Sequence, residues 1–441
     1  MKISERFIYN ISEKFNEPKW LKEFRLKSFD SFQNLPIERS ELFLKYSERK
    51  YEFDFNALEY NLISPEENKN IKLENSILTT SENISKKVNI NKEIIFTDIF
   101  SALKSIPKIK ELIINSSNDD KLEALNNSIF NSGIFIYVPK NNKVNIPLRS
   151  IFLIDKPKSA TFNKTIIFVD RGGSLDFINE VYSNNSSNCI YSENIEIFVK
   201  EGAEANITLF QNTCNKTQNY LNRKIFLNGE TSIFTVNIGG KVTRQRIECF
   251  LDHPKAKFEN YDMFFGNLDR SIDTFSRVIH NSPNTYSKVT SRIILKERAE
   301  SLFKGIIKIL KNAKNANAYL EEHSIMMDKE CKSNSIPSLE IETYDVKATH
   351  SSSTQQLDQD HKFYLMSRGL NEEKAKIVLA IAFFEPLLKS LFSNSFRKTI
   401  EKIVEDKWYN KNSELIISDI SDYSKISKEK ENLFRRHYKY R

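Results

Sequence analysis

The spacing of hydrophobic and polar positions changes character along the chain, and its first 130 residues predict mainly helices. Residues 1 to about 90 form the first helical part: Pro18 suits a first helical turn, and a broad arc at 100° per residue collects Trp20, Leu21, Phe24 and Phe32. Residues 64–92 are rich in Asn, Ser, Glu and Lys and show weak periodicity, which predicts a mobile linker. A second helical segment is expected from about 96 to 130.

From Gly133 the pattern changes to short strands. Runs of β-branched and aromatic residues, separated by polar turns, occupy 135–138, 151–154, 165–169, 174–178 and 195–199. A turn followed by an alternating strand recurs at Gly173, Gly202 and Gly229, at intervals of 27 to 29 residues. Weaker echoes follow at 254–257, 298–301 and 313–316. A repeat of this length, without helices between its strands, favours a parallel β-helix over the alternative of a β-sandwich.

The fold class predicted is therefore mainly β, with a parallel β-helix core between two helical regions. We place the N-terminal helical region at 1–132, the β-helix at 133–350, and a C-terminal helical domain with a basic tail at 351–441. The helical regions would cover the exposed coils of the solenoid.

The stretch from Pro337 to Gly369 marks the change from strand to helix. Residues 339–341 and 344–346 alternate as a half-buried strand does, and then small hydroxyl residues surround His350. A short helix around Phe363 should end at Gly369, so His350 is expected at the junction of a β region and an α region.

Two further helices are predicted beyond this junction. Asn371 can cap the first, whose body from Ile377 to Phe384 is apolar on all sides and should be buried, and Pro386 should kink or end it. The second is an amphipathic helix over 396–408.

Composition predicts a soluble globular protein, and the N-terminal sequence leads us to expect a cytoplasmic one. Hydrophobic residues make up 39% and charged residues 28%, and no apolar run approaches a membrane span. The N-terminus carries charges where a signal peptide needs an apolar core. Much of the net charge of +8 comes from the last twenty residues, so the body of the chain is nearly balanced and nucleic acid is not an expected partner.

Asparagine is expected to replace glycine in turns. The chain has only 10 glycines, and asparagine is the non-glycine residue that best tolerates left-handed backbone, as a run such as 183–188 would require.

No motif for nucleotide binding, hydrolysis or zinc binding is complete. The stretch Gly239–Thr243 lacks the leading spacing and the Ser/Thr after lysine of a phosphate loop, so no nucleotide is expected on this chain. Neither the four cysteines, Cys189, Cys214, Cys249 and Cys331, nor the histidines, His253, His280, His323, His350, His361 and His437, have zinc spacing. Structural roles are favoured for His280, His323 and Cys331, whereas His350 has an accessible setting.

Several motifs resemble the SufB/SufD family of iron-sulfur cluster assembly scaffolds. The C-terminal set is Pro337-x-Leu339-Glu340-Ile341, Asp345-Val346-Lys347-x-x-His350, Gln356-Leu357-Asp358 and Phe363-Tyr364-Leu365-x-Ser367-Arg368-Gly369. Earlier ones are Glu17-Pro18-x-Trp20-Leu21-x-x-x-Arg25, Gly239-Gly240-x-x-x-Arg244, Asp273-Thr274, His280-x-x-Pro283-Asn284 and Phe303-x-Gly305-x-Ile307. They cover most of residues 17 to 400 in the family's order.

The resemblance implies a right-handed parallel β-helix and a shared assembly site. It pairs the chain with a SufB-like chain through the β-helices and with a SufC-like ATPase through the C-terminal helices. His350 would be the SufD contribution to a transient iron or iron-sulfur cluster site, and this chain would be a non-catalytic scaffold subunit.

The chain looks SufD-like rather than SufB-like. Glu322 stands where SufB has a cysteine, and Thr349 and Ser351 replace the glutamates that flank the histidine in SufB. Ala348 replaces a cysteine found in many SufD chains, which removes a second ligand. A homomeric SufB-like scaffold and, less favoured, a polysaccharide-acting β-helix enzyme are the alternatives.

Overall fold

The fold is that of a computed structural model. It describes residues 3–38, 41–44, 58–60, 64–67, 75–80, 83–91, 93–116, 118–183, 187–391 and 394–410. Residues 411–441, which include the predicted basic tail, lie outside the described residues.

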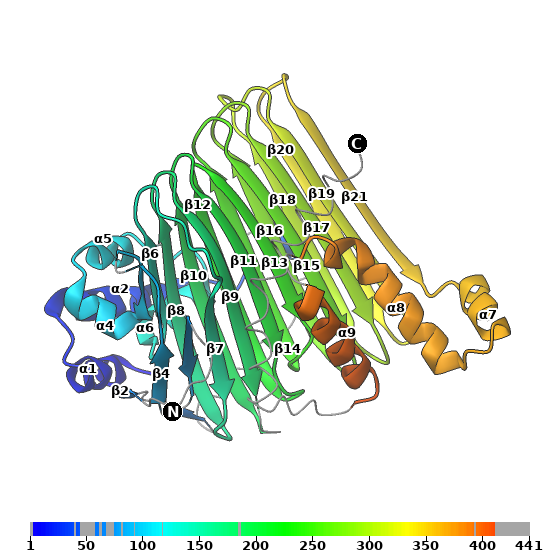
Figure 1. The fold of residues 1–441 in the computed structure, drawn as a ribbon, viewed down its shortest axis with the longest axis horizontal. Coiled ribbons are helices and arrows are strands. Elements are labelled where there is room, and N and C mark those ends of the chain that lie inside the picture. The colour runs from blue at the N-terminus through cyan, green and yellow to red at the C-terminus, as the bar shows by residue number, and fades with distance from the viewer. Residues whose placement is uncertain are drawn as a thin grey trace.

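Two long parallel sheets form a β-solenoid, which confirms the predicted fold class (Figure 1). The first, sheet A, contains β5 (Ile95–Asp98), β6 (Ile134–Val138), β8 (Ser159–Val169), β10 (Cys189–Val199), β12 (Thr217–Leu227), β14 (Val242–Leu251), β16 (Ser271–His280), β18 (Glu300–Ile309) and β20 (Lys332–Ile341), with β1 (Glu59–Tyr60) paired to β8. The second, sheet B, contains β2 (Ser64–Glu67), β4 (Asn83–Lys87), β3 (Ser76–Thr79), β7 (Leu148–Ile154), β9 (Ser174–Ser183), β11 (Glu204–Asn212), β13 (Glu230–Asn237), β15 (Lys257–Gly266), β17 (Tyr286–Leu295), β19 (Asn317–Met326) and β21 (Lys347–Gln356). Strands alternate between the sheets, so each coil contributes one strand to each, from β6 and β7 to β20 and β21.

Register explains why the repeat folds in this way. Residues that pair in register on successive strands form a column, and similar residues stack on each other in the interior columns. One such column of sheet A contains Ile167, Ile197, Ile225, Cys249, Val278, Ile307 and Leu339. All but Leu339 are buried in the core between the sheets, and Leu339 packs against it. The sheet B strands from β9 to β21 begin 26 to 31 residues apart, which sets the coil length that the glycine recurrences predict.

Several turns between coils require left-handed backbone. Gly202 has φ of +68°, and Asn141, Asn284 and Asn315 have φ of +58° to +60°. These turns confirm that asparagine serves where glycine is usual. The run at 183–188 lies partly outside the described residues.

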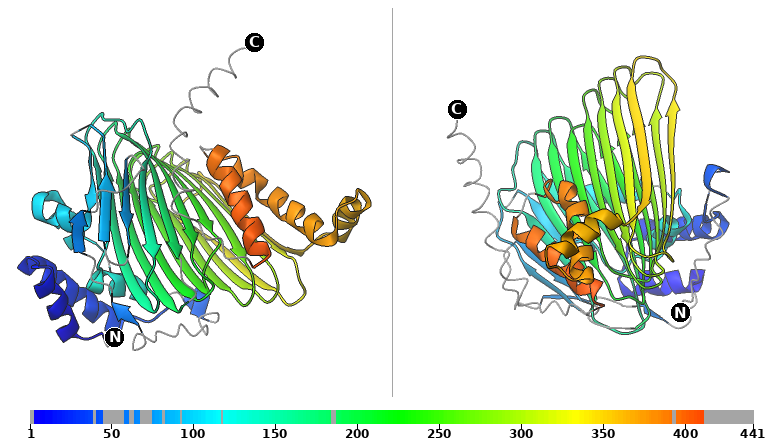
Figure 2. Two further views of the ribbon diagram at one scale, coloured as in Figure 1. Left: turned by 60° about the horizontal axis from the view of Figure 1, so that its bottom comes forward. Right: turned by 90° about the vertical axis from the view of Figure 1, so that its right-hand side faces the viewer.

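The N-terminal helices cover the outer face of sheet A (Figure 2). They are α1 (Glu5–Lys14), α2 (Lys19–Asn34), α3 (Glu41–Leu44), α4 (Ile99–Ser105), α5 (Lys108–Ile114) and α6 (Lys121–Ile129). Arg25 of α2 connects parts of this layer through buried hydrogen bonds. Its guanidinium donates to both carboxylate oxygens of Glu17 at 2.7 and 2.9 Å and to the Phe130 carbonyl at 3.0 Å, and the Arg25 and Glu17 side chains are 0% and 2% exposed.

The C-terminal helices lie on the opposite face, over sheet B. They are α7 (Gln359–Ser367), α8 (Glu372–Leu388) and α9 (Asn394–Trp408). Buried residues of α8 and α9 share a core cluster with outward-facing residues of sheet B, including Phe265 and Ile294. The Asn371 side chain caps α8, and Gly369, with φ of +93°, follows α7, as predicted. Helix α7 has no buried residue and projects from the body (Figure 1).

The N-terminal region differs from the sequence-based predictions. Strands β3 to β5 occupy positions that we expected to be linker or helix, because their hydrogen bonds to each other, to β6 and to β7 define them better than their composition does.

The C-terminal part departs from expectation in three places. Residues 344–346 form a turn rather than a strand, and Tyr344 is fully exposed. The β region extends to Gln356, six residues beyond the predicted boundary. Helix α8 is buried on one side only, since Val378 is 42% exposed, and Pro386 lies within its last turn.

We predict that Arg25→Ala lowers the free energy of unfolding by about 3–5 kcal/mol, because it leaves the buried Glu17 carboxylate without its counter-ion. Urea denaturation of the purified chain measures this. Lys27→Ala, on the exposed side of α2, is the control and should change stability by less than about 0.5 kcal/mol. Equal effects of the two substitutions would show that the pair does not hold this layer.

Candidate functional site

The last coil leaves one end of the solenoid open. Strand β20 pairs only with β18, and β21 pairs only with β19, among the described strands. Each therefore presents a free backbone edge, which is a template for pairing with another chain. Pro337 lies in β20, and proline, which has no N–H to donate, is confined to edge positions of this kind.

His350 lies on this open coil, within β21 rather than at its junction with the helices. Its register partner on β19 is Leu320, and the next residue down this column is Val289. Leu320 and Val289 belong to the interior core, so His350 occupies the final position of an interior column. His350 is exposed and makes no hydrogen bond or ion pair with any described residue. Its imidazole is therefore available to a ligand at the open end.

The hydroxyl residues around His350 divide between the two faces of β21. Ala348 and Ser352 share the interior side with His350, because residues of a strand alternate. Ser353 lies on the other side, where its hydroxyl is 2.6 Å from Nδ1 of His323. The hydroxyl cluster predicted from sequence is therefore split, and only part of it lies beside the imidazole.

Glu322 is buried directly beneath the open coil. It is 1% exposed, and its register partner Ser352 donates a hydrogen bond to its Oε2 at 3.0 Å. No described residue donates a hydrogen bond to its Oε1. Burial raises the pKa of the Glu322 carboxyl to about 7, against the opposing effect of the hydroxyls of Ser335, Ser352 and Ser324. A carboxyl that exchanges a proton near neutral pH thus lies one coil below the exposed histidine strand.

A line of polar residues leads to Glu322 through the interior. Its column continues to Ser291 and then to Asp262, which is 2% exposed and accepts hydrogen bonds from Asn260 at 2.7 Å and Gln245 at 3.1 Å. Burial also raises the pKa of Asp262, although its hydrogen bonds and the nearby Arg223 oppose this. This line was not predicted from the sequence. Its signal was small polar and acidic residues at alternate strand positions where a solenoid interior calls for Ile, Val or Leu.

Cys331 and His323 are not brought to His350. Cys331 is buried in a separate apolar cluster, burial raises the pKa of its thiol, and its Sγ donates to the Glu297 carbonyl at 3.3 Å. His323 faces outward on sheet B. Within the described residues, no three His, Cys, Asp or Glu side chains are grouped to hold a metal ion.

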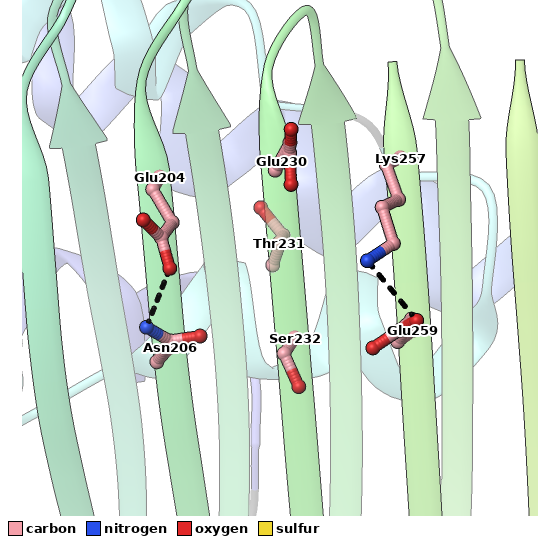
Figure 3. A pocket seen from close by; sticks show the side chains of 7 residues that line it. All are labelled: Glu204, Asn206, Glu230, Thr231, Ser232, Lys257 and Glu259. Atoms are coloured by element: carbon pink, nitrogen blue, oxygen red, sulfur yellow. Dashed lines mark hydrogen bonds and ion pairs between the residues drawn. The ribbon is translucent and has the colours of Figure 1, made fainter. Parts of the chain in front are cut away.

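A second polar feature is a hollow on the outer face of sheet B, where β11, β13 and β15 begin (Figure 3). Three carboxylates line it, Glu204, Glu230 and Glu259. Two of them already have partners: Asn206 donates to Glu204 at 3.0 Å, and Lys257 pairs with Glu259 at 3.2 Å. The hollow is a charged, solvated surface remote in register from His350.

Among the described helices, none combines the length and apolarity needed to cross a bilayer.

A protein-family model described as the SufBD core domain of the SUF system for FeS cluster assembly matches residues 152–383. Two curated relatives are each named an iron-sulfur cluster assembly SufBD family protein. The one from Staphylococcus aureus (strain MRSA252) is 30% identical over 426 residues, and the one from Staphylococcus saprophyticus is 28% identical over 426 residues. Both alignments cover 88% of this chain and 90% of the relative. The chain therefore belongs to the SufBD family of iron-sulfur cluster assembly proteins.

Proposed function

We propose that this chain is the SufD-like subunit of a SufBCD complex, and that its open end forms half of the site where a cluster is assembled. The observation that carries the proposal is His350, an exposed imidazole without a partner in the described residues on an unpaired edge strand. Neutral imidazole is a suitable iron ligand. One histidine cannot hold a cluster alone, so the remaining ligands come from a SufB-like chain.

The unpaired edges of β20 and β21 support that partnership. A second solenoid could continue both ladders by adding its own strands to these edges. His350 would then lie between the two chains, and the iron or cluster, which is cargo, would be shared. Sharing allows release, because separating the chains removes part of the ligand set.

Glu322 favours a SufD-like role over a homomeric SufB-like one. It stands where the family resemblance places the SufB cysteine, so this position holds a buried carboxyl of variable charge instead of a thiolate. Loss of its proton would add negative charge beneath the open coil when a cationic iron arrives. Mass measurement of the purified chain tests the SufD-like role. A cluster-bearing homodimer that forms without a SufB-like partner would contradict it.

The C-terminal helices supply a surface for the SufC-like ATPase. On α7, Phe363 is 72% exposed and Tyr364 is 56% exposed, and Val378 of α8 is 42% exposed. Exposed apolar side chains on a projecting helix indicate a protein-binding surface. ATP-driven movement of the partner would act through α7 and α8 on the last coil, and this chain itself would hydrolyse nothing.

His350→Ala, co-expressed with SufB-like and SufC-like partners, should lower the iron and sulfide bound per complex at least about tenfold, since even residues that merely support a ligand have effects of that size. Elemental analysis and visible absorbance measure this. Ser351→Ala, at the next position on the outward side, is the control. Unchanged cluster content in the His350 variant would remove this residue from the mechanism.

Glu322→Gln tests the buried carboxyl. Because the folded-state pKa of Glu322 is raised to about 7 from 4.5, the folded chain retains a proton that the unfolded chain releases between these pH values, and wild-type stability falls as pH rises through this window. We expect the variant to be more stable than wild type at pH 8, by up to about 3 kcal/mol, and similar to it at pH 4.5. Urea denaturation at both pH values measures this. Glu321→Gln, which faces outward on the same strand, should show no such gain at pH 8, and the same difference at both pH values for Glu322→Gln would contradict the raised pKa.

Phe363→Asp should weaken binding of the SufC-like ATPase at least about tenfold, because it places a charge in the proposed apolar contact. Calorimetric titration of the purified proteins measures this. Ile146→Asp alters an equally apolar residue, 46% exposed, on a turn of the solenoid, and should leave the affinity unchanged. If both variants bind like wild type, α7 is not the docking surface.

A further inference from the structure

Two cations are buried where the end of α9 meets the solenoid. Arg270 lies in the turn before β16 and is 2% exposed, and Lys407 lies in the last turn of α9 and is 5% exposed. Neither forms an ion pair with a carboxylate in the part of the chain that the structure describes. Buried charges are normally paired, because removing them from water is costly. Burial of these two cations without a carboxylate partner is therefore unfavourable unless another group compensates their charge.

The neighbours of Arg270 are neutral. Its guanidinium donates to Oδ1 of Asn237, to the Thr243 hydroxyl at 3.0 Å and to the Phe265 carbonyl. Its Nε has no acceptor, and neither has Nδ2 of Asn237, within the described residues. Both unmet groups are donors, and both are buried in the same cluster. The cluster thus has an excess of donors and of positive charge.

Lys407 adds a second positive charge to this cluster. Its ammonium donates to the Thr213 carbonyl at 3.4 Å, a long hydrogen bond to a neutral group. Burial and the charge of Arg270 lower the pKa of Lys407 to about 8, with a weaker opposing effect from Cys214. Burial alone lowers the pKa of Arg270 to about 9. Both groups therefore remain mainly protonated at pH 7, and their charges repel.

We propose that a small inorganic anion of chloride size binds between Arg270 and Lys407, accepting hydrogen bonds from Nε of Arg270 and Nδ2 of Asn237. It would supply the negative charge that the described residues of the cluster do not. The ligand is a single-atom anion because the cluster is buried and its neighbouring backbone amides are already used. In the adjacent turn, Gly239 donates to Oε1 of Gln211 at 3.3 Å, and Gly240 donates to the Thr213 carbonyl at 3.2 Å. This turn therefore lacks the free amides of a phosphate loop.

The bound anion would stabilise the packing of the C-terminal helices on the solenoid. Arg270 belongs to the solenoid, whereas Lys407 belongs to α9, and Nδ2 of Asn267 beside them donates to the Lys407 carbonyl at 3.2 Å and to Oδ1 of Asn410 at 2.8 Å. An ion that binds only the folded chain stabilises it in proportion to its concentration and affinity.

Bromide diffraction tests the site directly. Crystals of the full chain soaked in sodium bromide should show an anomalous peak between Arg270 and Lys407. Absence of that peak would overturn the proposal.

Thermal unfolding provides a second test. At constant ionic strength, replacing gluconate by chloride should raise the Tm of the wild type by about a few degrees with saturation. Lys407→Met should lose this response, and Lys402→Met, on the exposed side of the same helix, should keep it. Equal chloride responses of wild type and Lys407→Met would overturn the proposal. If Lys407→Met does not fold, the wild-type bromide result decides alone.

Discussion

In-register stacking of parallel coils is the constraint on which this structure depends. Because each strand pairs residue by residue with the strand one coil away, every interior position becomes a column. A column must end where the coils end. The residue at the last position of a column has the register of a core residue, but no further coil covers its side chain. His350 is such a residue. The same rule that builds the core therefore also exposes a ligand-type side chain at one end.

The two ends of the solenoid differ in a way that follows from this constraint. At the N-terminal end, the short antiparallel strand β5 closes sheet A, and β3 and β4 continue sheet B. At the C-terminal end, β20 and β21 remain parallel and ten residues long, and each pairs on one side only among the strands that the structure describes. The described helices cover opposite outer faces of the sheets and therefore leave this edge accessible. One end is thus suited to closure and the other to a partner.

Much of this architecture could be predicted from sequence, because its physical cause is local. The glycine recurrences at 173, 202 and 229 mark coil turns, and the β-branched runs between them supply the residues that stack into columns. Strands β3 and β4 could not be predicted, since hydrogen bonds to other strands rather than composition define them. Residues 344–346 were wrongly predicted to be a strand, because apolar and polar residues alternate in this exposed turn as they do in a strand.

The candidate site was only half visible in the sequence. The setting of His350 and the family motifs identified the residue, but its place at the end of a column depends on the register of eight coils. The raised pKa of Glu322 follows from burial, and the only local signal of that burial is the polar and acidic residues at interior strand positions. Arg270 and Lys407 are 137 residues apart in the sequence, so no local pattern predicts that they lie together.

Hydrogen exchange of β21 in the chain alone and with a SufB-like partner tests the central claim most directly. Within residues 347–356, every second backbone amide already donates to β19, as that of Lys347 does to the Ala316 carbonyl at 2.9 Å. We predict that the intervening amides, which point away from β19, exchange rapidly in the free chain and become protected in the complex, as strand addition at this edge requires. Unchanged exchange in β21, in a complex shown by mass to be intact, would contradict a site shared across the open end.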